Sequence, residues 1–189
     1  MSLENALLGL LIDKPMAGYD LKKILDYPMS FFWAAQMSQI YRELNKLEKK
    51  GLVKSEVKTQ EKRPARKVYQ LTKEGKETFL NWLNRFPDQL SEASRSRFIM
   101  RIFFSSRIEL DEFAFQIKRY KKEKEKQLRY LFKVEQWIKD YSREEKYKDD
   151  IFYWHLIVKK EYKSIAAGIE WADECLQLIE QKKRKNEQI

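Results

Sequence analysis

A chain of 189 residues is long enough for one large domain or two small ones. Charged residues make up 36% of it, and five glycines and four prolines are few, so the composition favours long helices with solvated faces. Thirty-nine Lys and Arg residues against 29 Asp and Glu give a net charge of +10, which points to a polyanionic partner, either nucleic acid or an acidic membrane surface.

Several chemistries are excluded because the chain has one cysteine and one histidine. An intrachain disulfide and a Cys/His zinc site within one chain cannot form. No acidic pair stands beside a second chemical group, so we expect a non-enzyme with no catalytic residue, metal or cofactor. Cys175 is expected to be a reduced cytosolic thiol at a helix surface or interface rather than a redox switch.

The longest apolar run is Ala6 to Ile12, far shorter than the roughly 20 residues of a membrane span. No positive residue precedes this run and Asp13 follows it, which is a poor pattern for a signal peptide. We therefore expect a cytoplasmic protein that does not bind membranes.

Three short amphipathic helices are predicted at the start of the chain. The first ends at the turn residues 13–18, and the second ends before Pro28. The third spans residues 38–50, after which Gly51 suits a left-handed C-cap. Their apolar faces are Leu3, Ala6, Leu7, Leu10 and Leu11; Leu21, Ile24 and Leu25; and Ile40, Leu44 and Leu47.

A β-hairpin and a fourth helix follow. Alternating residues predict strands at 52–57 and 65–71, joined by a long charged loop over residues 58–64. Thr72 is expected to cap the fourth helix, whose apolar face is Phe79, Trp82, Leu83 and Phe86. Residues 87–94 are the best linker, so we expect one domain over residues 1–86 and a second over residues 95–189.

The second domain is predicted to be entirely helical, so the fold class is mainly α. A helix over about residues 94–104 precedes two helices of more than 25 residues each. In the last helix apolar residues recur at close to 3.5-residue spacing, which is typical of a coiled coil. Because one chain is not expected to cover both long helices, we predict a homodimer that Asp at Ile165 and Ile169 would dissociate. The predicted dimer seam is Trp154, Val158, Ile165, Ile169, Ala172, Leu176 and Ile179.

Most of the positive charge lies in the third helix and the hairpin. Residues 42–76 hold twelve basic and five acidic side chains, a net charge of +7 in 35 residues. A helix that is apolar on one face and basic or amide-rich on the other fits the major groove of DNA. A solvated surface helix is the alternative interpretation. The polar face and its flanks comprise Ser38, Gln39, Tyr41, Arg42, Asn45, Lys46 and Lys49.

Two interpretations remain open for the helix start. Gln39 and Arg42 can pair with adenine or guanine edges, while Ser38 and Tyr41 suit phosphate contacts. Alternatively, Gln39 is a surface residue of the cap region and Arg42 clamps a phosphate. The hairpin tip carries Lys62, Arg63, Arg66 and Lys67, which could reach phosphates or the minor groove, or form an ordinary charged loop.

At this point the sequence resembles the PadR family of bacterial transcriptional regulators. The matching stretches are LLGLL at 7–11, GYDLKK at 18–23, SQIYRELNKLEKKGLV at 38–53 and RKVYQLTKEGKETFLNWL at 66–83. The helical second part looks like the virulence-activator-type C-terminal domain of one subgroup. The resemblance implies a winged helix-turn-helix, with three helices and a two-stranded wing, followed by a long-helix dimerisation domain.

The resemblance further implies sequence-specific operator binding as a homodimer, most often as a repressor. In one branch of the family a small aromatic acid releases the repressor, so a small effector is expected. The second helix would begin at the DNA backbone with Tyr19. A closed dimer predicts an inverted-repeat operator in double-stranded DNA. The expected DNA-binding residues are Tyr19, Ser38, Gln39, Tyr41, Arg42, Lys46, Lys62, Arg63, Arg66 and Lys67.

An effector pocket is the least defined of these expectations. Trp33, Trp154 and His155 are the candidates, although Trp33 could equally anchor the core and His155 could serve packing. A second function class also stays open, a non-enzymatic protein-interaction module with a coiled-coil dimer and a winged helix that does not bind specific DNA. The concentration of +7 favours the DNA-binding regulator.

Overall fold

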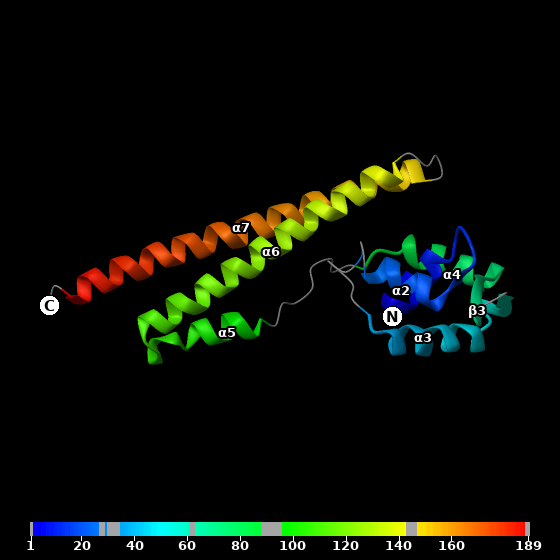
Figure 1. Cartoon of the computed structure of the whole chain (residues 1–189), viewed down its shortest axis with the longest axis horizontal. Helices are drawn as coiled ribbons and strands as arrows, with labels where there is room; N and C mark the ends of the chain where they lie inside the picture. Colours follow the sequence, from blue (N-terminus) through cyan, green and yellow to red (C-terminus); the bar gives the residue numbers. More distant parts are fainter. Residues whose placement is uncertain are drawn as a thin grey trace. The chain divides into compact units, whose positions relative to one another are not determined.

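The computed structural model describes residues 2–26, 29, 35–60, 63–87, 96–142 and 147–187. They fall into two units, Met1–Glu92 and Ala93–Ile189, each described by itself below (Figure 1). The first contains α1 (Ser2–Leu10), β1 (Met16–Ala17), α2 (Gly18–Asp26), α3 (Met37–Lys49), β2 (Val53–Gln60), β3 (Arg63–Leu71) and α4 (Lys73–Leu83). The second contains α5 (Arg97–Phe103), the 3-10 turn η2 (Ser105–Arg107), α6 (Leu110–Tyr141) and α7 (Lys148–Glu187).

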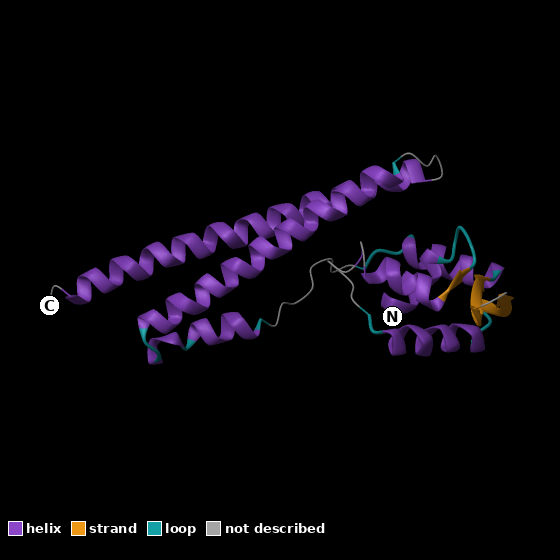
Figure 2. Cartoon of the chain, viewed as in Figure 1, coloured by secondary structure: helices purple, strands orange, loops and turns teal. Residues whose placement is uncertain are grey.

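The fold class is mainly α, as predicted, with all the described strands in the first unit (Figure 2). These strands form one antiparallel sheet in the order β1-β3-β2. Strand β1 was not predicted; it pairs Met16 with Tyr69 and Ala17 with Val68 on β3. The hairpin strands are longer than predicted, because β2 continues to Gln60 and β3 starts at Arg63. Most of the expected loop 58–64 is therefore strand.

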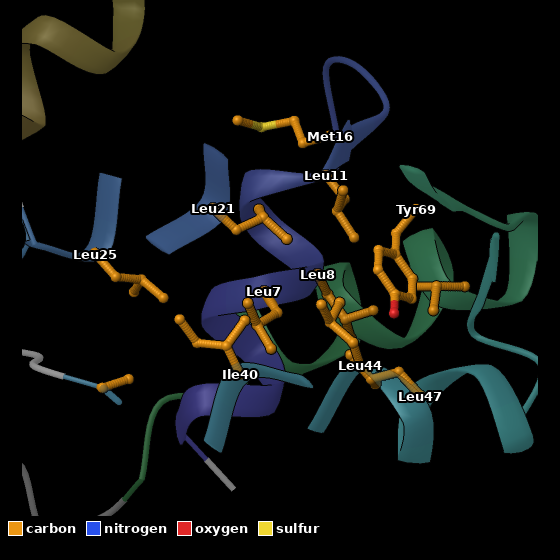
Figure 3. Packing of buried hydrophobic residues seen from close by; sticks show 12 residues of the cluster. Leu7, Leu8, Leu11, Met16, Leu21, Leu25, Ile40, Leu44, Leu47 and Tyr69 are labelled. Atoms are coloured by element: carbon orange, nitrogen blue, oxygen red, sulfur yellow. The ribbon is translucent and has the colours of Figure 1, made fainter. Parts of the chain in front are cut away.

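The core of the first unit lies where α1, α2, α3 and the sheet meet. Figure 3 shows leucines of α1 and α2 directed toward the apolar face of α3, with the Tyr69 ring of β3 beside them. The buried set is Leu7, Leu8, Leu11, Met16, Leu21, Leu25, Ala35, Ile40, Leu44, Leu47, Val53 and Tyr69. This packing leaves the opposite face of α3 in solvent.

A Schellman motif ends α3 and starts the sheet. The Leu52 N–H donates to the Leu47 carbonyl at 2.9 Å, and the Gly51 N–H donates to the Glu48 carbonyl at 3.0 Å. Gly51 has a φ of 71°, the left-handed conformation expected from the sequence. The motif sets the angle at which the chain leaves α3 to form the wing.

The start of α4 is fixed to this same turn. The Thr72 hydroxyl accepts a hydrogen bond from the Gly75 N–H at 3.0 Å, which confirms the predicted N-cap. The Thr72 N–H donates to the Leu52 carbonyl at 3.1 Å. Phe79 packs against the core, but Trp82, Leu83 and Phe86 of the expected apolar face are exposed. The sequence prediction for α4 is therefore right about where the helix begins, whereas Phe86 lies beyond its end at Leu83 and the three side chains do not form a buried face.

In the second unit, α6 and α7 pack antiparallel to each other. Lys121 Nζ of α6 lies 2.6 Å from Asp173 Oδ1 of α7. Lys183, near the end of α7, pairs with Asp111 in the first turn of α6. Helix α5 joins them through Phe98, which stacks on Tyr120 with ring centroids 4.9 Å apart. Within the described ranges, no helix is both long enough and apolar enough to cross a membrane.

The apolar stripe of α7 faces α6 of the same chain. Four of the residues predicted to form the dimer seam, Val158, Ile165, Ala172 and Ile179, are already buried here, and Trp154, Ile169 and Leu176 are half-buried. The expectation that the stripe would be exposed in a single chain is corrected. Heptad spacing indicates that a helix packs against a partner helix, and in this chain that partner is α6. The buried residues of α6 are Ala114, Ile117, Leu131, Val134 and Ile138.

Candidate nucleic-acid interface

The exposed face of α3 is polar and basic, as its sequence predicts. With Ile40, Leu44 and Leu47 buried, the helix presents the other side to solvent. The Arg42 side chain is 65% exposed, and its nearest acidic neighbour is Glu43 at 3.8 Å. Lys46 Nζ lies 2.8 Å from Glu43 Oε1 on the same helix. The exposed polar residues are Ser38, Gln39, Tyr41, Arg42, Asn45, Lys46 and Lys49.

Gln39 takes part in capping α3. Its side-chain oxygen accepts a hydrogen bond from the Gln36 backbone N–H at 2.8 Å. Bidentate pairing of a glutamine with adenine requires both the oxygen and the nitrogen of the carboxamide. Gln39 would have to leave the cap to read adenine in this way, so its contact agrees with the cap interpretation of this residue.

Tyr41 fixes the position of α3 against the start of α2. A Cβ atom added at Gly18 would lie only 2.6 Å from Tyr41 Cε1, so the ring packs closely on the Gly18 backbone and would have to move aside for a larger residue. Tyr19, the next residue, is 59% exposed, and Lys23 Nζ lies 4.6 Å from the centre of its ring. Tyr19 and Tyr41 therefore both border the surface that α3 presents.

The wing residues are held by acidic partners. Arg66 Nη1 lies 3.6 Å from Asp20 Oδ2 on α2, and Lys67 Nζ lies 2.8 Å from Glu48 Oε2 on α3. As neighbours on a strand they point to opposite faces of β3. Lys62 lies outside the described residues, and for Arg63 only the backbone, paired with Gln60, is described. Of the four predicted wing cations, the two with described side chains are thus ion-paired.

Glu48 contacts both strands of the wing. The hydroxyl of Ser55 on β2 donates to Oε1, while the Lys67 ammonium of β3 donates to Oε2. These bonds lower the pKa of Glu48 and raise the pKa of Lys67. The contact therefore stabilises the unit fully at pH values above the ordinary pKa of a glutamate and below the ordinary pKa of a lysine. It is lost as the pH falls through the lowered pKa of Glu48 or rises through the raised pKa of Lys67.

Sequence reasoning missed Asp20 and Glu48. Asp20 entered it only within the second-helix start that the resemblance implied, and Glu48 only as one of five acids in the basic segment. For Glu48 one signal was available, because an acidic residue in the last turn of a helix opposes the helix dipole and favours a cation nearby. That signal does not identify Lys67, nineteen positions away, as the partner.

Two of the three residues expected at an effector pocket, Trp154 and His155, lie within the described structure. Trp154 lies at the junction of α6 and α7, with its ring centroid 5.3 Å from Trp137 and 5.6 Å from Tyr147. His155, the next residue, is exposed, and Trp33 lies outside the described ranges. Cys175 is half-buried beside α6, and this burial raises the pKa of its thiol, which opposes a reactive role.

Comparison with known proteins adds family information to this geometry. Residues 7–81 match the transcriptional regulator PadR-like family, and residues 94–180 match the virulence activator alpha C-terminal domain. The chain is 34% identical over 104 residues to the negative transcriptional regulator PadR of Bacillus subtilis (strain 168). That match covers 55% of this chain and 57% of the relative, so it spans little more than half the relative's length.

Two solved structures share the fold. The crystal structure of Bacillus subtilis PadR in complex with operator DNA has a TM-score of 0.79 and 25% identity, covering 95% of this chain and 99% of that one. The crystal structure of the same protein in complex with p-coumaric acid has a TM-score of 0.74 and 24% identity, with the same coverage. At these identities the similarity is mainly one of architecture.

Proposed function

The chain belongs to the PadR-like family of transcriptional regulators, in the subgroup with a virulence-activator-type C-terminal domain, and on this basis we propose that it binds operator DNA and regulates transcription. The observation that carries the proposal is the exposed polar face of α3 beside the wing, in a segment of net charge +7. A helix of this kind fits the major groove, and the surrounding cations suit phosphates. The similarity to a protein solved in complex with operator DNA supports DNA binding.

We propose repression as the direction of regulation and a small aromatic molecule as the releasing effector. The 34% identical relative is a negative regulator, and that protein is solved with p-coumaric acid. Trp154 remains the proposed contact, because it lies among aromatic rings that could stack on such a molecule. Trp33 and His155 stay candidates from the sequence.

The experiment that tests the function is a gel shift with a site selected from random DNA. Arg42→Ala should weaken binding to that site by about 1–3 kcal/mol and tolerate a changed base at one position, because a base contact is lost. Lys46→Ala removes the same charge from the same face and should weaken all sequences alike. Equal loss on selected and random DNA for Arg42→Ala would make Arg42 a phosphate clamp. Wild-type protein without any sequence preference would contradict the proposed function.

We also propose a homodimer formed through the second unit. Because α6 covers the α7 stripe, we propose instead an apolar patch that stays exposed in the first turns of α7, where four large apolar side chains follow closely in the sequence. Phe152, Tyr153, Leu156 and Ile157 are between 38% and 62% exposed, and Tyr153, Leu156 and Ile157 lie at i, i+3 and i+4 on one side of the helix. Full burial of an exposed apolar side chain contributes roughly 1.5–3 kcal/mol, and covering the exposed part of each of these would contribute about half of that. The proposed seam thus moves from the heptad residues to this neighbouring face.

Light scattering checks the dimer directly. The intact protein at micromolar concentration should show twice its chain mass of 23.0 kDa. Tyr153→Asp combined with Leu156→Asp should give a folded monomer, because both side chains are exposed in the single chain. Ser164→Asp, at an exposed polar position of the same helix, is the matched control and should stay dimeric. A monomeric wild-type protein would exclude the dimer.

A further inference from the structure

We propose that Glu48 is a positioning residue that couples the wing to α3 and thereby sets the selectivity for DNA sequence. The inference rests on the proposed DNA-binding function and deepens it. It assigns a role in DNA recognition to an acidic side chain, although a negative charge near the phosphates lowers the affinity for DNA.

The geometry places one carboxylate between three elements. Glu48 lies in the last turn of α3, Ser55 on β2 donates to one of its oxygens, and Lys67 on β3 approaches the other at 2.8 Å. Ser55 and Lys67 lie on the same face of the hairpin, since Ser55 pairs with Tyr69 and Lys67 with Val57. Lys67 Nζ also lies 5.1 Å from the centre of the Tyr69 ring, which is part of the core.

An acidic side chain at position 48 is electrostatically unfavourable for both the helix and DNA binding. A negative charge in the last turn of a helix is disfavoured by the helix dipole. A negative charge beside a phosphate-binding surface also reduces affinity for DNA. Glu48 in addition occupies Lys67, which would otherwise be available to a phosphate. The carboxylate therefore costs affinity in two ways, and what it provides is a fixed angle between helix and wing.

Glu43 supplies the contrast within the same helix. It lies 2.8 Å from Lys46 and 3.8 Å from Arg42, both on α3, so its ion pairs join no other element. Replacing Glu43 or Glu48 with glutamine removes one negative charge from one helix. Only the change at Glu48 weakens a side-chain contact between α3 and the wing.

The two roles have opposite effects on binding. Loss of the Glu48 charge strengthens attraction to any DNA, and the freed Lys67 can add one phosphate contact. Loss of the fixed angle weakens the simultaneous docking of α3 in the major groove and of the wing beside it. Only the selected site gains affinity from this simultaneous docking. The ratio of affinities for a selected site and a scrambled site should therefore fall, while the salt dependence becomes steeper.

The experiment selects a site from random DNA with wild-type protein and measures its affinity and that of a scrambled site over a range of salt. Glu48→Gln should lower the affinity ratio about tenfold, as expected for the loss of one charge-assisted hydrogen bond. The slope of log K against log salt on scrambled DNA should steepen by about one. Glu43→Gln should keep the ratio of the wild-type protein. Exchange of the pair, Glu48→Lys with Lys67→Glu, keeps the net charge and should restore most of the ratio.

Each outcome of this experiment supports or overturns the proposed role of Glu48. An unchanged ratio in Glu48→Gln, or an equal fall in Glu43→Gln, overturns the inference while sequence selection by wild-type protein still supports the proposed function. If wild-type protein enriches no sequence, the proposed function fails and the inference fails with it. Should Glu48→Gln not fold, Lys67→Gln opens the same contact from the wing side. A uniform loss on both sites would then make Lys67 a simple phosphate contact and overturn the proposal.

Discussion

Replacing Ile165 with aspartate should unfold the α6–α7 pair. The Ile165 side chain is 2% exposed in the single chain, on the face of α7 that packs against α6. Aspartate there would place a charge without a partner among apolar groups and remove the packing of an isoleucine. We expect a loss of unfolding free energy on the order of 4 kcal/mol, seen as a large fall in the thermal midpoint measured by helical circular dichroism.

The control is Ser164→Asp, one position along the helix and exposed, which should leave the thermal midpoint nearly unchanged. This prediction replaces the expectation that aspartate at Ile165 and Ile169 would simply separate a dimer. An Ile165→Asp protein that keeps the wild-type midpoint and becomes a monomer in light scattering would contradict the packing described here. It would place Ile165 at a contact between two copies.

Replacing Gly75 with alanine should destabilise the first unit. An added Cβ would lie 2.0 Å from the Leu52 carbonyl oxygen, and this oxygen is backbone held by the Thr72 N–H. The clash should cost about 3 kcal/mol, the upper part of the usual range for overpacking. Alanine returns about 1 kcal/mol of helix propensity, so the net loss is about 2 kcal/mol. For a unit of this size the thermal midpoint should fall by roughly 10 °C.

Gly51→Ala is the comparison for Gly75→Ala. Nothing lies within 4 Å of a Cβ at Gly51, so its cost comes from a φ of 71° alone and should be about 1 kcal/mol. Gly51→Asn should recover part of that loss, because asparagine tolerates the left-handed region. Asparagine at Gly75 should be no better than alanine. Equal midpoints for the Gly75→Ala and wild-type proteins would show that α4 can shift freely from Leu52.

The elements that the sequence predicted well are those in which one periodic face carries the signal. Apolar residues three and four apart identified α1, α2, α3 and the long helices, because burial on one side produces that spacing directly. Gly51 and Thr72 were also recognised, since a left-handed C-cap and an N-cap each require particular residue types. These local rules do not depend on which element packs against which.

Very short strands, and strand segments that leave the core, were harder to predict. Strand β1 has two residues, too few for alternation to appear. The outer part of the wing has no apolar alternation because it leaves the core: Val57 is 65% exposed although it shares a face with buried Val53. The sequence therefore suggested a loop where hydrogen bonding between strands continues.

Partners across long separations were not accessible from one sequence. The stripe on α7 was recognised, but its spacing does not distinguish α6 of the same chain from a second copy. Likewise, Glu48 was counted as one of five acids in a basic segment, and its contact with Lys67 follows only from the hairpin register. Gln39 illustrates the same limit, because its residue type suits both base reading and the cap that it occupies.

The symmetry of the protected DNA distinguishes a homodimer with two recognition helices from a single bound helix. A homodimer with two copies of α3 requires two major grooves on one side of the duplex, one helical turn or a multiple of it apart. Footprinting on a site selected from random DNA should show an inverted repeat with half-site centres about 10 base pairs, or a multiple of that, apart. Arg42→Ala should weaken protection equally in both halves. A single asymmetric half-site, protected by one helix alone, would contradict DNA binding by a symmetric homodimer.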